Sequence, residues 1–112
     1  VRAVAEAEGG DAEAAVERAA RHGPSAIPEV ESALQGAEVE GRLNLIGVLR
    51  RIGDAEAVPL VLHRAIHDAD ERVRAEAKWT LDQWTGAKGP LGDRARAALR
   101  TLAEARKEDA AG

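Results

Sequence analysis

The chain has 112 residues, which is the length of one compact domain or of a short array of repeats. Its 16 basic and 20 acidic side chains give a formal charge of -4, which excludes a general electrostatic attraction to nucleic acid or anionic membranes. The absence of Cys excludes disulfides, thiolate metal sites and cysteine nucleophiles, and 25 Ala with no Phe or Tyr favour close helix packing over sheet.

Glycine, proline and acidic turns divide the chain into about six segments of helical length, with boundaries at 9–10, 23–24, 36, 53–54, 68–70 and 86–89. Four side chains are the expected N-caps after these boundaries: Asp11, Ser25, Asp54 and Asp70. No stretch of five or more residues alternates apolar and polar residues convincingly, so strands find no support. We expect an all-α protein.

Large apolar residues cover more than half the circumference of the segment at about 40–52, which predicts a helix covered on several sides by its neighbours in sequence. Its narrow polar strip consists of Glu40, Asn44, Gly47 and Arg51. The segments at about 55–67, 71–85 and 90–107 each carry one apolar stripe, the pattern of a helix buried on one side.

Two blocks of the sequence repeat each other. Residues 26–30 match residues 57–61 at an offset of 31. After one inserted residue, Arg42, Leu45, Leu49 and Ile52 match Arg74, Ala77, Leu81 and Trp84 at an offset of 32. Each block predicts a short helix with Pro28 or Pro59 in its first turn, a tight acidic turn and a longer helix. A repeated helix pair of this period is typical of an α-solenoid.

The second block resembles the HEAT-like repeat, most closely the short bacterial form also found in phycobilin lyases. A Gly-Asp turn at 53–54 precedes a Val-Pro helix start at 58–59. The family's Asp-x-x-Val-Arg-x-x-Ala-x-x-x-Leu pattern is filled by Asp70, Val73, Arg74, Ala77 and Leu81. The match is strong over about 52–86 and fair over about 24–54, where Gly-Arg replaces Val-Arg at 41–42.

The resemblance implies a short right-handed α-solenoid, an armadillo-like superhelix of about six helices, as a single domain over 1–112. Its parts would be irregular N-terminal helices (1–23), two repeats (24–54 and 55–86) and a C-terminal capping helix (90–108). Val-Arg-Ala at 1–3 echoes Val-Arg-Ala at 73–75. Either the chain begins inside a longer array, or this short match is chance in a sequence rich in Ala and Arg.

His63 and His67 stand four residues apart on a predicted helix, a spacing at which two imidazoles can bind one metal ion. Asp68, Asp70 and Glu71 are the local candidates for further ligands. The helical wheel places both histidines opposite the apolar stripe, and the His-Glu dipeptides known from di-iron HEAT-like hydroxylases do not occur here. A polar helix face is therefore the preferred interpretation, and we expect no metal and no cofactor.

Catalytic motifs are equally sparse. None of the five Ser and Thr residues has a His at a sequence spacing that would indicate a nucleophile with its base. The Gly-rich stretch at 86–92 contains Lys88 but lacks the Gly-Lys-Ser/Thr ending of a phosphate-binding loop, so we interpret it as a flexible joint. Carboxylate pairs are abundant in a chain with 32% charged residues and do not indicate acid/base catalysis. We expect no enzyme, although the family resemblance leaves lyase activity open.

Basic residues concentrate in the last helical segment, at Arg94, Arg96, Arg100, Arg106 and Lys107. Some HEAT-like solenoids act as DNA glycosylases through basic concave faces, so nucleic-acid binding is an alternative. Acidic residues are interleaved with the basic ones and no aromatic residue is present to stack on a base, which disfavours it. Acidic residues concentrate in the first third of the chain and basic residues in the last third. Contact between these two parts of neighbouring chains explains this uneven distribution of charge equally well.

Trp84 lies on an apolar stripe and is expected in the core, whereas Trp79 lies on its flank. Packing of Trp79 against the next helix is the preferred interpretation. An exposed Trp79 beside Arg74 and Lys78 would instead anchor a protein partner.

The expected function is a non-catalytic protein-interaction or scaffold module, because stacked repeats present an extended surface. The expected partner-binding residues lie on the second helices of both repeats: Glu40, Asn44, Gly47, Arg51, Arg74, Lys78, Trp79 and Asp82. Gly47 is expected to leave a dent for a partner side chain. The alternative to this function, by resemblance, is a bilin lyase or chaperone-like role. The composition indicates a bacterial protein, and the expected location is the cytoplasm.

Overall fold

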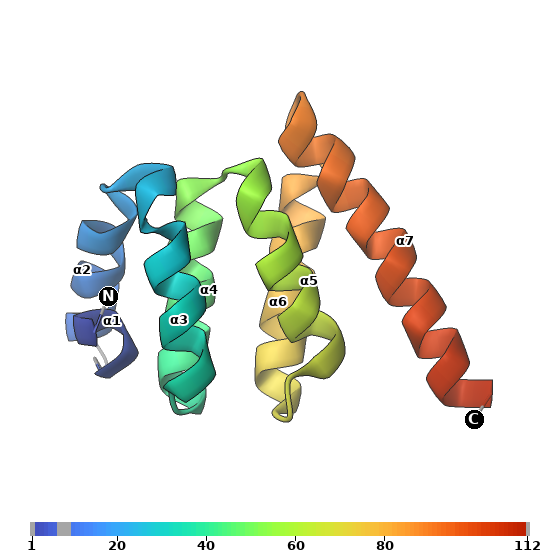
Figure 1. Ribbon diagram of the computed structural model, residues 1–112, viewed down its shortest axis with the longest axis horizontal. Helices are drawn as coiled ribbons and strands as arrows, with labels where there is room; N and C mark the ends of the chain where they lie inside the picture. The colour runs from blue at the N-terminus through green and yellow to red at the C-terminus, as the bar shows by residue number, and fades with distance from the viewer. Residues whose placement is uncertain (1, 7–9, 112) are drawn as a thin grey trace. The chain divides into compact units, whose positions relative to one another are not determined.

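The computed structural model describes residues 2–6 and 10–111, which form seven α-helices, two short 3-10 helices and no strand (Figure 1). The α-helices are α1 (Arg2–Glu6), α2 (Gly10–Ala20), α3 (Ile27–Gly36), α4 (Val39–Ile52), α5 (Val58–His67), α6 (Glu71–Trp84) and α7 (Pro90–Ala111). The 3-10 helices, Gly23–Ala26 and Ala55–Ala57, lead directly into α3 and α5. The expected all-α class is confirmed for these residues.

The chain forms two compact units, Val1–Asp54 and Ala55–Gly112. The helices α1 to α4 belong to the N-terminal unit, and α5 to α7 belong to the C-terminal unit. Each unit contains fully buried apolar side chains of its own. The division falls between Asp54 and Ala55, the position at which the two sequence repeats are expected to meet.

In the N-terminal unit, α1, α2 and α3 all pack against α4. The helices α3 and α4 run antiparallel to each other (Figure 1). Leu45, Ile46, Val48 and Leu49 of α4 are completely buried. The expectation that this helix is covered by its neighbours in sequence is therefore confirmed.

The short helix α1 reaches α4 through two specific contacts. The side-chain amide of Asn44 donates a hydrogen bond of 3.1 Å to the backbone oxygen of Val4. A Cβ atom on Gly41 would overlap the backbone oxygen of Ala5, so α1 and α4 approach each other at a position that only glycine allows. Asn44 thus satisfies a backbone carbonyl of α1, and Gly41 leaves space for the α1 backbone.

In the C-terminal unit, α5 and α6 form an antiparallel pair and α7 packs against both (Figure 1). Val61, Val73, Ala77 and Leu81 are completely buried at 0% exposure. Trp84 is 5% exposed, which confirms its expected place in the core. The apolar stripe of α7 adds Ala95, Ala98 and Leu102 to the buried residues of this unit.

The two helix pairs match each other in length. The helices α3 and α5 each have 10 residues, and α4 and α6 each have 14. The connection from α3 to α4 consists of residues 37–38 and that from α5 to α6 of residues 68–70, so the inserted residue of the alignment lies in this turn. Pro28 and Pro59 both occupy the first turn of their helices, as expected, where a missing N–H removes no helical hydrogen bond.

A matched pair of arginines closes the turn in both helix pairs. The Arg42 guanidinium donates a hydrogen bond of 2.7 Å to the backbone oxygen of Ala37, the C-cap residue of α3. The Arg74 guanidinium donates one of the same length to the backbone oxygen of Asp68, the C-cap residue of α5. Both arginines therefore satisfy a carbonyl at the end of the preceding helix, which has no partner within that helix.

The structure confirms one of the four expected N-caps. Asp70 caps α6, since its carboxylate accepts hydrogen bonds from the backbone N–H groups of Arg72 and Val73. Asp11 is wrong as a cap, because it lies inside α2. Ser25 is also wrong, since its hydroxyl donates to the backbone oxygen of His22 and lies within a 3-10 helix. Asp54 precedes a 3-10 turn rather than the start of α5.

The Gly-rich stretch before α7 forms a hydrogen-bonded turn. The backbone N–H of Ala87 donates to the Trp84 oxygen, and that of Asp93 donates to the Gly89 oxygen. The Arg96 guanidinium donates to the backbone oxygen of Thr85 across the turn at 2.7 Å. Gly89 has a φ of 74°, a conformation that favours glycine. The stretch that the sequence suggested as a flexible joint therefore contains turn hydrogen bonds.

Candidate interaction surface

Trp79 is the only exposed large apolar side chain among the residues that the structure describes, with 48% of its surface accessible. It lies on the outward side of α6, while Val73, Ala77 and Leu81 point into the core of the C-terminal unit. The preferred expectation that Trp79 packs into a neighbouring helix is therefore wrong, and the alternative of an exposed side chain holds. An exposed indole offers a partner a large apolar area together with an N–H donor.

The exposed neighbours of Trp79 on α6 include an ion pair, an alanine and a glutamine. Lys78 and Asp82 form an ion pair of 3.0 Å, with 41% and 43% of their side chains exposed. Ala75 and Gln83 are exposed on the same helix one turn before and one turn after Trp79. Residues Lys78, Trp79 and Asp82, which were expected at a binding surface, thus lie together here, and we call this group the α6 surface.

Arg74 was expected on the same surface but has a structural position. Its side chain is partly buried, and its guanidinium bonds the Asp68 backbone oxygen. The expectation that Arg74 is freely accessible is wrong because the turn between α5 and α6 needs a donor at this point. The equivalent contact made by Arg42 identifies the reason, since both arginines follow the same turn.

The polar strip of α4 is only partly accessible. Glu40 and Arg51 are exposed, but Asn44 is partly buried beneath α1. Gly47 is buried, and a Cβ placed there would meet the Val16 side chain of α2 at 3.7 Å. The expectation of a dent open to a partner at Gly47 is therefore wrong, because α2 covers this position.

The eight expected partner-binding residues are divided between the units. Glu40, Asn44, Gly47 and Arg51 belong to the N-terminal unit, and Arg74, Lys78, Trp79 and Asp82 belong to the C-terminal unit. Within the N-terminal unit, α1 and α2 cover the middle of the strip at Asn44 and Gly47. The α6 surface is consequently the part of the expected site that keeps an accessible apolar centre.

Asp68 is a structurally important residue that the sequence suggested only as a metal ligand. It is 4% exposed, and its carboxylate forms an ion pair of 3.2 Å with Arg64 and accepts a 2.9 Å hydrogen bond from the Asp70 backbone N–H. The turn from α5 to α6 thus contains a buried carboxylate whose partners include a guanidinium charge and a backbone donor. The spacing of Arg64 and Asp68, four residues apart, is the sequence signal that points to this pair.

The carboxyl group of Asp70 has a lowered pKa. Desolvation acts to raise this pKa, but the backbone hydrogen bonds from Arg72 and Val73 and the nearby Arg72 charge together outweigh it. The Arg72 guanidinium lies 3.5 Å from the carboxylate. This electrostatic arrangement stabilises the start of α6 and leaves no proton on Asp70 near neutral pH for acid/base chemistry.

The histidine pair lies on the exposed side of α5. Both His63 and His67 are exposed, as the helical wheel predicts, and their ring centroids are 4.9 Å apart with the ring planes inclined by 47°. In the part of the chain that the structure describes, no cluster of three or more His, Asp or Glu side chains surrounds a common point. The pair therefore provides two imidazoles without a third protein ligand among these residues.

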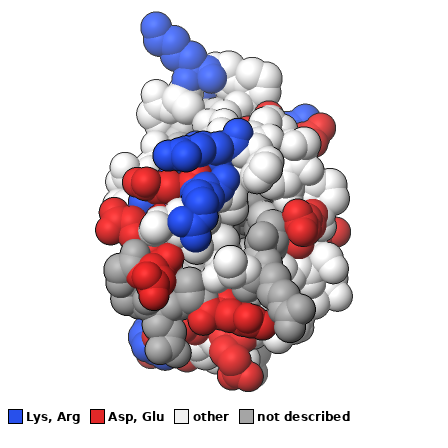
Figure 2. Space-filling view, turned by 90° about the vertical axis from the view of Figure 1, so that its left-hand side faces the viewer, with Lys and Arg blue, Asp and Glu red and all other residues white. Residues whose placement is uncertain are grey.

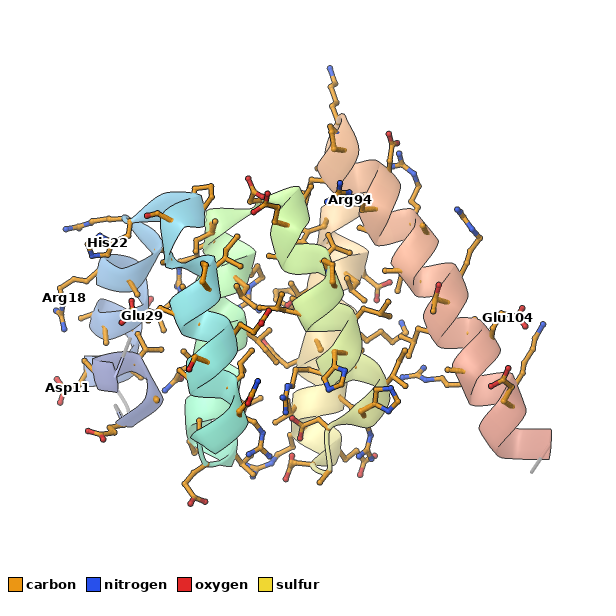
Figure 3. All side chains as sticks on the ribbon, viewed as in Figure 1. Asp11, Arg18, His22, Glu29, Arg94 and Glu104 are labelled. Carbon is orange, nitrogen blue, oxygen red and sulfur yellow. The ribbon has the colours of Figure 1, made fainter. Side chains whose placement is uncertain are left out.

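The basic side chains of α7 are partly engaged with acidic or backbone groups. Arg96 pairs with Asp93, and Lys107 lies 3.7 Å from Glu104. Arg94, near the start of α7 in Figure 3, donates a long hydrogen bond of 3.4 Å to the Ala55 oxygen. This interleaving matches the pattern read from the sequence, and acidic side chains offset part of the basic charge that would attract a phosphate backbone.

The face of the molecule in Figure 2 carries both signs of charge. Basic side chains gather toward its upper part, and acidic side chains spread around and below them. A surface of mixed sign offers no uniform field to a polyanion.

The surface hollows of the N-terminal unit include two that border Glu29. One of about 490 Å³ includes Glu6, Glu29 and Glu38 in its lining. The other, of about 410 Å³, lies among small residues, with Arg18 and His22 projecting from the α2 side and Glu29 from α3 (Figure 3). Both volumes fall within the range of small-ligand sites. The three carboxylates of the larger hollow would repel the propionate groups of a bilin, so this hollow does not favour the bilin alternative.

No family model, curated protein or solved structure matches the chain. The geometry of the described residues is therefore the ground for a functional proposal. Within residues 2–6 and 10–111, no helix combines the length and the apolar content that crossing a bilayer requires.

Proposed function

We propose that the chain is a short right-handed α-solenoid of HEAT-like repeats that acts as a non-catalytic protein-interaction module. Its partner docks on the α6 surface, with Trp79 as the central apolar contact. The observation that carries this proposal is the 48% exposure of Trp79 beside the Lys78–Asp82 pair. Tryptophan is enriched among residues that contribute most to binding, and a polar rim around one apolar side chain is the usual anatomy of an interface.

The repeat assignment rests on the correspondence between the two helix pairs. Equal helix lengths, a Pro in each first turn and the matched Arg42 and Arg74 contacts occur in both. In repeat proteins such units stack on their neighbours and present adjustable surface residues. The second helix of a repeat is then a reasonable place for a binding surface.

A capture experiment tests the assignment of the α6 surface. The wild-type chain and the variants Trp79→Ala and Gln83→Ala are immobilised and exposed to an extract of the organism that encodes the protein. We expect wild-type and Gln83→Ala to retain the same partner, and Trp79→Ala to lose at least about tenfold in affinity, as for other central interface residues. Equal retention by Trp79→Ala would contradict the proposal.

Fluorescence provides the matching test on the bound complex. Trp79 is half-exposed and Trp84 is buried, so acrylamide should quench Trp79 emission preferentially. A Trp84→Phe variant isolates the Trp79 signal. Binding of the captured partner should shield this signal from the quencher, whereas unchanged quenching would place the interface elsewhere. Circular dichroism establishes beforehand that each variant remains folded.

A further inference from the structure

The histidine pair of α5 has the geometry of a two-ligand metal site. His63 and His67 are exposed, and their ring centroids lie 4.9 Å apart. With a metal–nitrogen distance of about 2.1 Å, each ring centroid lies about 3.2 Å from the ion, so two rings at octahedral to tetrahedral angles lie about 4.5–5.2 Å apart. The observed separation falls within this interval, so the two rings lie at the spacing of adjacent ligands.

The surroundings of the pair tolerate a cation. His67 is the last residue of α5, where the partial negative charge of the helix C-terminus favours positive charge. Arg64 lies between the two histidines in sequence, but its charge is paired with the buried carboxylate of Asp68 at 3.2 Å. The neighbouring arginine is therefore compensated, and Asp68 is committed to the turn rather than to a ligand.

We propose that His63 and His67 form a bidentate site for a late divalent transition-metal ion, with Cu²⁺ bound most tightly. Neutral imidazole suits Cu²⁺, Ni²⁺ and Zn²⁺, and affinity for a nitrogen site rises toward Cu²⁺ in the divalent series. The remaining positions on the ion stay open for water or for a group from another molecule. This site is independent of the proposed interface, because it lies on α5 rather than on the α6 surface.

A site with two protein ligands loses its metal readily to chelators and on dilution. The sequence alone led us to expect no metal, and the proposal departs from that expectation. Without added metal, His63→Ala should leave the melting temperature unchanged, since both rings are exposed. Added metal should stabilise the wild-type chain and not this variant.

The experiment titrates the purified full chain with CuCl₂ by calorimetry and records electron paramagnetic resonance spectra at equal protein and copper concentrations. We expect one exchangeable Cu²⁺ per chain, nitrogen hyperfine structure from two imidazoles and a rise in melting temperature. His63→Ala and His67→Ala should each weaken binding at least about tenfold, because either change turns a chelate into a single contact. Both should also remove the metal-dependent rise in melting temperature.

His22 is the matched control, because it is the third histidine of the chain, is exposed and lies in the N-terminal unit (Figure 3). His22→Ala should leave the affinity, the spectrum and the metal-dependent stabilisation unchanged. Binding that survives in His63→Ala or in His67→Ala at the wild-type affinity would overturn the proposal. An equal loss in His22→Ala would do the same, since it would show non-specific binding to exposed imidazoles.

Discussion

Arg42 and Arg74 occupy the same position in the two helix pairs, and each satisfies the C-cap carbonyl of the helix before it. The alignment of the two blocks matches these residues, but a helical wheel assigns Arg74 to the surface. Side chains as long as arginine can reach back over a turn while remaining partly exposed, so a wheel does not decide their role. The repetition of the residue after both turns is the signal that identifies a structural contact.

Replacing Arg74 should destabilise the protein more than replacing a surface cation. Arg74→Ala removes a charged donor from a partly buried carbonyl and should lower the free energy of unfolding by about 1.5–3 kcal/mol. Lys78→Ala, which breaks an exposed ion pair on the same helix, should change it by less than about 1 kcal/mol. Urea unfolding followed by circular dichroism measures both values. Equal effects would show that the Arg74 contact contributes nothing beyond a surface pair.

Asp68 should be similarly sensitive, because its carboxylate is almost completely buried. Asp68→Ala leaves the Arg64 guanidinium and the Asp70 backbone N–H without this partner and should cost about 1–3 kcal/mol. Asp82→Ala on α6 is the exposed comparison and should cost less than about 1 kcal/mol. The same urea experiment compares them, and a neutral Asp68→Ala would mean that water replaces the carboxylate.

At the scale of the helix, Asp70 is a capping residue that the sequence predicted and that also affects the electrostatics of the helix start. The residue was predicted as a cap from its position before an apolar periodic segment, and its carboxylate accepts two backbone N–H groups at the start of α6. Asp11 and Ser25 carry the same kind of signal but do not cap, since α2 begins at Gly10 and a 3-10 turn leads into α3. Near Asp11, the helix already begins at Gly10. Near Ser25, a 3-10 turn that contains Pro24 precedes α3, so neither residue stands at the start of an α-helix.

The lowered pKa of Asp70 predicts a pH dependence of stability. The folded-state pKa lies below the ordinary value of 3.8, so the ionised carboxylate stabilises the fold above that value. This contribution is lost as the pH falls through the folded-state pKa. Asp70→Asn retains a capping oxygen but no charge, so its melting temperature should lie below that of the wild type at pH 7. The difference should shrink as the pH falls below 3.8.

Asp70→Ala provides the comparison for this measurement, because it removes the capping oxygen as well as the charge. Its difference from Asp70→Asn should remain constant across the same pH range. Thermal unfolding at a series of pH values from 7 to about 2.5 records all three proteins, spanning the usual range of carboxyl titration. A wild-type advantage over Asp70→Asn that stays constant down to the lowest pH would contradict the assigned pKa direction.

At the scale of the whole molecule, the helical class, the two Pro positions and the inserted residue between the repeats could be predicted from the sequence. These features depend on local chemistry and on the self-similarity of the chain. The contact of α1 with α4 could not be predicted from the sequence, because Asn44 and Val4 lie 40 residues apart. The sequence of the polar strip is the same whether water or a backbone covers it. The exposure of Trp79 was also open, because a residue on the flank of a stripe suits either environment.

The proposed solenoid predicts that the two units unfold together. Both tryptophans lie in the C-terminal unit, so fluorescence reports on that unit while circular dichroism reports on all helices. Leu49→Ala creates a cavity in the N-terminal unit and should cost about 2–5 kcal/mol. If the repeats are coupled, the fluorescence transition shifts in urea by the same amount as the circular dichroism transition.

Leu81→Ala is the reciprocal variant, since Leu81 is completely buried in the C-terminal unit. It should shift both signals equally and by a similar amount. A fluorescence transition that does not move in Leu49→Ala, while part of the circular dichroism transition does, would show two independently folding units. That outcome would contradict the solenoid.

The close approaches at two glycines have a consequence for how freely this sequence can vary. A Cβ at Gly41 would overlap the Ala5 oxygen, and a Cβ at Gly92 would overlap the Ala87 oxygen, so even alanine must displace a backbone there. Gly36 has open space instead. In a saturation library selected for folded protein, codons other than glycine should disappear at 41 and 92 but persist at 36. At Gly41 and Gly92 neutral drift is thus blocked by a carbonyl oxygen rather than by the packing of side chains.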